Sequence, residues 1–143
     1  MNTQNFPNSL RIAVSMKIIE HAFDKLIFTK HNLTAQSHGV LLLAYFVEGI
    51  TQNEIAELAK TDKSAVLRQI DLLEKEKLVC RKTDAQDRRK NHIMVTERGK
   101  LIVQNIVNEE KRVFSSLMEG IDEQEFETFY KVLNVMKINA EKV

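Results

Sequence analysis

The chain has 143 residues, of which 43% are hydrophobic, a formal net charge of +1 and a single cysteine. This size and composition favour a single domain over residues 1–143, and one cysteine excludes an intrachain disulfide framework. The longest apolar run, residues 40–47, is far shorter than the roughly 20 residues that cross a bilayer, and the first residues lack a basic-then-apolar leader. We therefore expect a cytoplasmic protein that makes no contact with a membrane.

The first two predicted elements are helices. Over residues 10–28, apolar residues recur at alternating steps of four and three, which is the stripe of a helix packed along another helix. Thr34 can cap a second helix through "AQSHGVLLLAYFV", which ends near Gly49. Its nearly continuous apolar character predicts a buried helix.

Two shorter helices follow across a very short turn. In "ITQNEIAELA", Thr51 and Glu54 form a capping box, so a helix begins there. The next helix opens near Asp62 and reads "DKSAVLRQIDLLEKEK". Its inward face carries Val66, Ile70 and Leu73. Its outward face carries Ser64, Leu67, Arg68 and Asp71.

A hairpin and two more helices complete the chain. Residues 78–83 and 91–95 are β-prone and predict two strands joined by a polar loop. Thr96 caps a helix to about residue 118 that is apolar on two sides, so one side can pack within the chain and the other against a partner. Asp122 and Glu125 form a capping box for the final helix.

The charge is distributed unevenly along the chain. Residues 60–100 hold twelve Lys or Arg and seven Asp or Glu, a net charge of +5, whereas the remainder carries −4. A basic cluster such as Arg88, Arg89 and Lys90 is often only a solvated face, but this asymmetry also suits a polyanionic partner.

Helix, turn, helix and then a hairpin with a basic loop is the order of a winged helix-turn-helix. The expected fold is mainly α with a small β-hairpin. A helix fits the major groove of DNA, and an arginine on a thin loop can enter the minor groove. On this interpretation Arg89 enters the minor groove, with Arg88 and Lys90 beside it, and Asp87 orients a neighbouring arginine. The major-groove face consists of Lys63, Ser64, Leu67 and Arg68.

The segment "TQNEIAELAKTDKSAVLRQIDLLEKEKLVCRKTDAQDRRKNHIMVTERGK" resembles the MarR family of bacterial transcriptional regulators in its helix order, its Asp-Arg-Arg wing and the Thr-x-x-Gly that follows. The wing arginine that enters the minor groove in the family falls on Arg89. Lys77 stands at a position that is often glycine in such proteins. The resemblance implies a DNA-binding region at 34–100 and dimerisation helices at 1–30 and 101–143.

The resemblance also implies how such a protein works. It indicates a homodimer that binds double-stranded DNA at a palindromic operator and represses transcription. Many relatives release DNA when a small phenolic or other ligand binds between the dimerisation and DNA-binding regions. The sequence does not identify such an effector.

Other functions receive less support from the sequence. No Gly-rich phosphate loop, Gly-x-Ser-x-Gly elbow or His-Glu-x-x-His motif occurs, which argues against an enzyme. The four histidines lack zinc-site spacing, so we expect no metal, no cofactor, and surface or capping roles for them. Cys80, in a predicted strand, is expected to be a buried structural thiol. The remaining alternative is a winged-helix module that binds protein instead of DNA.

Overall fold

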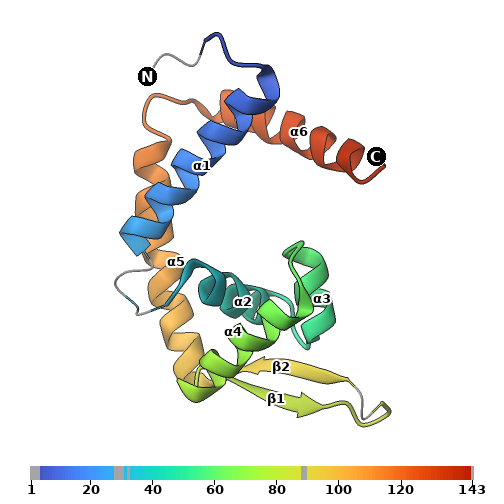
Figure 1. The fold of residues 1–143 in the computed structure, drawn as a ribbon. Coiled ribbons are helices and arrows are strands. Elements are labelled where there is room, and N and C mark those ends of the chain that lie inside the picture. The colour runs from blue at the N-terminus through green and yellow to red at the C-terminus, as the bar shows by residue number, and fades with distance from the viewer. Residues whose placement is uncertain (1–3, 28–30, 32, 88–89, 143) are drawn as a thin grey trace. The chain divides into compact units, whose positions relative to one another are not determined.

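The computed structural model describes residues 4–27, 31, 33–87 and 90–142. Its elements follow the predicted order (Figure 1). They are α1 (Asn8–Ile27), α2 (Ala35–Phe46), α3 (Gln52–Leu58), α4 (Lys63–Lys75), β1 (Val79–Thr83), β2 (Asn91–Val95), α5 (Glu97–Leu117) and α6 (Glu123–Ala140). The expectation of a mainly helical fold with one antiparallel hairpin is confirmed. Within this described part, no helix is both long and apolar enough to cross a membrane.

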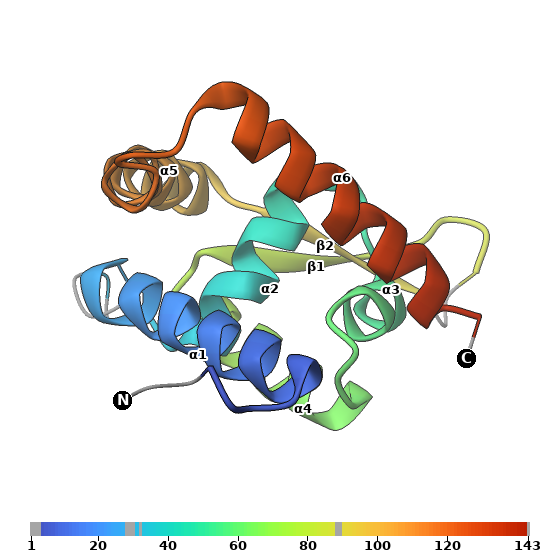
Figure 2. The same ribbon diagram turned by 90° about the horizontal axis from the view of Figure 1, so that it is seen from above.

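The chain divides into two compact units, Met1–Glu110 and Lys111–Val143. In the first unit, α2 lies against α4 and β2, and α3 lies against α4 and β2 (Figures 1 and 2). The core side chains of this unit, which come also from α5, are almost fully buried, among them Leu41, Ile55, Ile70, Leu73, Ile93, Val103 and Ile106. In the second unit, Phe114 packs edge-on against Phe126, with ring centroids 5.6 Å apart. The core of the first unit therefore holds α4 and the hairpin in place.

Side chains at the predicted positions cap four helices. Thr34 caps α2 by accepting the N–H of Ser37, and capping boxes begin α3 at Thr51 and α6 at Asp122. The carboxylate of Asp62 accepts the N–H groups of Ser64 and Ala65 at the start of α4. These two hydrogen bonds lower the pKa of Asp62. The first turn of α4 therefore begins at a fixed residue.

Lys60 and Lys77 adopt left-handed backbone conformations, with φ values of 49° and 59°. Each stands just after a helix and ends it in the same way: the lysine N–H and the next N–H bond back to carbonyls of the last turn. For Lys77, this explains why glycine is favoured at that position, since glycine adopts positive φ without a steric penalty. The turn into β1 forms nevertheless, because Leu78 and Leu73 are both buried beside it.

Thr96 and Gly99 join the start of α5 to the start of the hairpin. The hydroxyl of Thr96 donates to the carbonyl of Lys77 at 2.7 Å and accepts the N–H of Gly99 at 3.0 Å. A Cβ at position 99 would lie 2.1 Å from the carbonyl oxygen of Leu78 and 2.7 Å from Val95. The Thr-x-x-Gly pattern therefore allows the start of α5 to pack closely against the start of the hairpin.

The structure corrects three expectations. Cys80 is exposed, because Val79 takes the inward position of β1 and the next residue faces solvent. His38 is buried on α2, where burial and the charge of His31 lower its pKa to about 4. On α5, one apolar side was predicted to carry Ile102, Ile106 and Val113, and the other Val103, Val107 and Phe114. Its buried residues are Gly99, Val103 and Ile106, so the inward stripe combines residues from both sides.

Candidate nucleic-acid interface

The helix α4 presents two different faces. Val66, Ile70 and Leu73 are buried against the core. The other face exposes Lys63, Ser64, Leu67 and Arg68, the four residues predicted for the major groove. Leu67 is 41% exposed, although it is apolar. The exposed face therefore combines two cations, a hydroxyl and a methyl-bearing side chain, the set that can contact phosphates and base edges.

The hairpin lies next to this helix. Its strands pair from Val79 opposite Val95 to Thr83 opposite Asn91, and residues 84–90, here called the wing loop, connect them. Lys90 is exposed. Arg88 and Arg89, predicted to contact DNA, lie outside the described residues, so their role stays a prediction.

Asp84 organises the wing loop, and this role was not predicted. Its Oδ1 accepts the N–H of Gln86 at 2.7 Å and of Asp87 at 2.9 Å, while its own N–H donates to the carbonyl of Lys90 at 2.9 Å. Asp87, predicted to orient an arginine, is half-buried in this loop. The signal for Asp84 was available, because an aspartate at the start of a polar turn bonds N–H groups two and three residues on.

His92 is a second residue whose contribution was not predicted. Its ring contacts Asp84 in the wing loop and the carbonyl of Gly49 before α3. His92 and Gly49 are 43 positions apart, so no local pattern indicates the contact. Among the residues that the structure describes, no group of three His, Cys, Asp or Glu side chains could hold a metal ion.

Arg81 connects β1 to α4. Its guanidinium forms ion pairs with Asp71, at 2.5 Å, and with Glu74, and its backbone N–H also donates to Glu74. Asp71, predicted on the outward face of α4, therefore points to the hairpin. These contacts hold β1 against α4, and they pair the charge of Arg81 within the protein.

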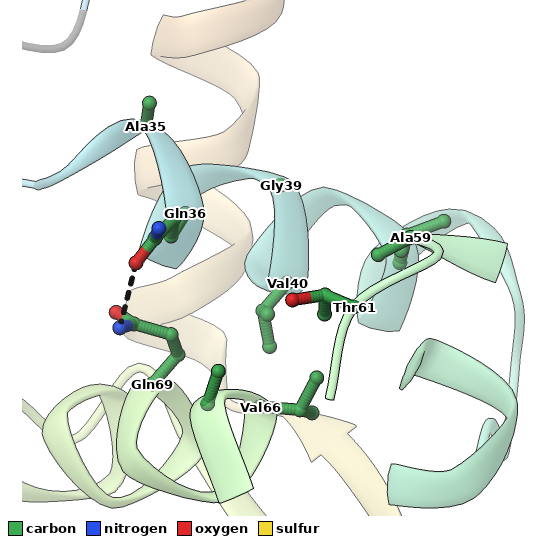
Figure 3. A pocket seen from close by; sticks show the side chains of 10 residues that line it. Ala35, Gln36, Gly39, Val40, Ala59, Thr61, Val66 and Gln69 are labelled. Carbon is green, nitrogen blue, oxygen red and sulfur yellow. Dashed lines mark hydrogen bonds between the residues drawn. The ribbon is translucent and has the colours of Figure 1, made fainter. Parts of the chain in front are cut away.

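A pocket of about 280 Å³ lies between α2, α4 and the turn that precedes α4 (Figure 3). At its edge, Gln69 donates to Gln36 at 3.3 Å and accepts a hydrogen bond from Ser37 at 2.6 Å. No charged residue lines it. A Cβ added to Gly39 in its wall would meet nothing within 4 Å. The wall of the pocket is therefore formed by uncharged side chains of α2, α4 and the turn between α3 and α4.

A second pocket of about 240 Å³ lies in the same unit, between the start of α2, the end of α4 and the first turns of α5. Three charged or titratable residues line it: His31 before α2, Glu76 just after α4, and Arg98 in α5. His31 also contacts Glu109 of α5 at 3.3 Å. This pocket is suited to a ligand with an anionic group, because Arg98 lies in its wall.

Comparisons with known proteins agree with this geometry. Residues 31–90 match the model of the MarR family. A helix-turn-helix transcriptional regulator of Bacillus subtilis, YybA, is 26% identical over 80% of this chain and 77% of its own length. A crystal structure of MarR superposes with a TM-score of 0.82 and 25% identity, covering 99% of this chain and 95% of that one. CouR from Rhodococcus jostii, bound to p-coumaroyl-CoA, superposes with a TM-score of 0.79 and 25% identity, covering 90% of each chain.

Proposed function

Because the chain belongs to the MarR family of DNA-binding transcriptional regulators, we propose that it is a homodimeric repressor that binds a palindromic operator and responds to a small ligand. One observation carries the proposal: the exposed polar face of α4 and the basic hairpin lie side by side in the +5 segment. Such a regulator acts in the cytoplasm, where it meets DNA, and needs no catalytic site.

Each part of this surface has a distinct role in the proposal. Arg68 pairs with guanine or phosphate in the major groove, and Leu67 contacts a thymine methyl group. Lys63 and Ser64, at the start of α4, position the helix on the backbone. In the wing loop, Arg89 enters the minor groove, Arg88 and Lys90 contact phosphates, and Asp87 orients an arginine.

The homodimer is supported by apolar surface on the terminal helices. On α6, side chains such as Phe129, Val132, Val135 and Met136 are each at least 45% exposed. On α1, Leu10, Ile12, Met16, Ile18 and Ile19 are each at least 42% exposed. A second copy of the chain is the occupant that covers these faces and also places two winged helices on two half-sites.

The ligand response is supported by the second pocket. A molecule bound there contacts both the end of α4 and the start of α5, so it can favour one position of α4 over another. CouR, a relative, is bound to a phenolic thioester in its structure. We propose a small phenolic carboxylate whose carboxylate pairs with Arg98. A panel of phenolic carboxylates, tested for DNA release by the wild type and by Arg98→Gln, checks this part.

The central proposal predicts salt-sensitive binding to specific duplex DNA. Fragments of the source genome are selected on the immobilised protein, sequenced, and then titrated at several salt concentrations. We expect a shared palindrome, and an affinity that falls steeply with salt because each neutralised phosphate releases counterions. Recovery of no preferred fragment, together with salt-independent retention, would favour the alternative of a module that binds protein.

A further inference from the structure

The ring of His92, in β2, joins two distant parts of the first unit. Its Nδ1 lies 2.5 Å from the carbonyl oxygen of Gly49, and its Nε2 lies 2.8 Å from Oδ2 of Asp84. Gly49 belongs to the turn between α2 and α3, whereas Asp84 begins the wing loop. The side chains of His92 and Asp84 are 28% and 27% exposed, so the contact is partly shielded from water. His92 therefore bridges the wing loop and the entry to the helix-turn-helix.

Both ring nitrogens face hydrogen-bond acceptors. A peptide carbonyl has no hydrogen to donate, and neither does an ionised carboxylate. Asp84 stays ionised, because hydrogen bonds from His92 and then from the N–H groups of Asp87 and Gln86 lower its pKa to about 2. A neutral imidazole has one N–H and can satisfy only one of the two acceptors. An imidazolium, which carries two N–H groups, satisfies both acceptors.

The charged groups around the ring favour this protonated form. The hydrogen bond to Asp84 raises the pKa of His92, the bond to the Gly49 carbonyl adds to this, and the charges of Asp84 and Glu54 act in the same direction. Burial opposes them. Among the described residues, the nearby cations are Lys82 and Lys90. Lys82 pairs with His92 in the β-ladder, and the charge of Lys90 acts on Glu54, as that of His92 does.

The bridge holds a residue on which the shape of the wing loop depends. One oxygen of Asp84 binds His92, and the other binds the N–H groups of Gln86 and Asp87. The next residue in β2, Ile93, donates its N–H to the carbonyl of Ile50 at 2.9 Å. One cation thus links the turn of the wing loop to the backbone immediately before α3.

We propose that His92 is a positioning residue for DNA binding: its imidazolium clamps the wing loop to the turn before α3, and loss of the proton releases the loop and weakens operator binding. This inference rests on the proposed function, since it assumes that the wing loop contacts DNA. The folded-state pKa of His92 lies above its unfolded value. The clamp is therefore complete below about pH 6.5 and is lost as the pH rises through the raised pKa.

The test is the pH profile of DNA affinity at constant ionic strength, using a duplex selected by the wild-type protein. We expect wild-type affinity to fall as the pH rises from 6 to 9, because the clamp loses its proton over this rise. His92→Gln should bind weakly at pH 6 and show no such fall, because an amide has no titrating proton. Asp84→Asn should also lose the fall, although its remaining oxygen still accepts the N–H groups of the loop. His21→Gln, at an exposed histidine of α1, should keep the wild-type profile.

A second measurement observes the clamp without DNA. Nitrogen NMR of the His92 ring should show both nitrogens protonated at neutral pH. If the wild type binds no duplex, the proposed function fails and the clamp has no role in it. If the wild type binds DNA and His92→Gln keeps the same pH profile, or if the free ring is neutral at pH 7, the clamp alone is overturned.

Discussion

Gly99 has no side chain because the backbone of the hairpin occupies the place where one would lie. A Cβ there would be 2.1 Å from a carbonyl oxygen, which cannot move away as the end of a flexible side chain can. Gly39 is also inside a helix, but a Cβ at that position meets open space. The two glycines therefore differ in function, although both interrupt helical sequences in the same way.

This difference gives a prediction for stability. We expect Gly99→Ala to lower the free energy of unfolding by about 1–3 kcal/mol, because α5 must shift away from β1. Gly39→Ala is the matched control and should raise it by up to about 1 kcal/mol, since alanine is the better helix former. Urea denaturation of both variants measures these changes. Equal effects of the two substitutions would contradict the role assigned to Gly99.

At the scale of single elements, α4 and the hairpin were predictable because local sequence patterns determine them. Caps at Thr51, Asp62 and Asp122 form where side chain and N–H are three residues or fewer apart. The faces of α4 follow from the helical period. The bridge from Asp84 through His92 to Gly49 was not predictable, because tertiary packing brings its members together. The burial of His38 and the exposure of Cys80 were missed for the same reason, since each depends on what covers the element.

The division of roles between helix and wing predicts two different phenotypes. Arg89→Ala should weaken operator binding by roughly 1–3 kcal/mol while the protein remains folded and dimeric. Arg68→Ala should weaken binding similarly and also reduce sequence specificity, because Arg68 is the residue proposed to contact base edges. Titrations against the selected duplex and against single-base variants measure both effects.

Arg112→Ala is the control for these variants, because it removes an exposed arginine outside the basic segment. It should leave affinity unchanged. Wild-type affinity of Arg89→Ala at physiological salt would show that the wing assignment is wrong.

At the scale of the whole molecule, the proposed function depends on a second copy of the chain. One winged helix contacts about one half-site, and two related by symmetry double the contacts. No residue of α6 is buried in the single chain. Its exposed apolar side chains, such as Phe129 and Val132, are therefore covered only in the proposed dimer.

This dependence predicts a variant that separates the subunits. Val132→Glu combined with Val135→Glu should give a monomer in sedimentation experiments, because two carboxylates would be buried in an apolar interface. Operator affinity should fall with it, since one subunit keeps only one half-site. Lys137→Glu introduces a carboxylate on a different face of α6 and should remain dimeric. A dimer that survives the double substitution would place the interface elsewhere.

The ion pairs of Arg81 with Asp71 and Glu74 have a consequence for operator architecture. Because they tie β1 to α4, the major-groove and minor-groove contacts proposed for one subunit should keep a constant spacing. Inserting one base pair between these contacts lengthens the DNA by about 3.4 Å, and the protein cannot follow. Natural operators of this regulator should therefore tolerate a change in length only at the centre of the palindrome, between the two subunits.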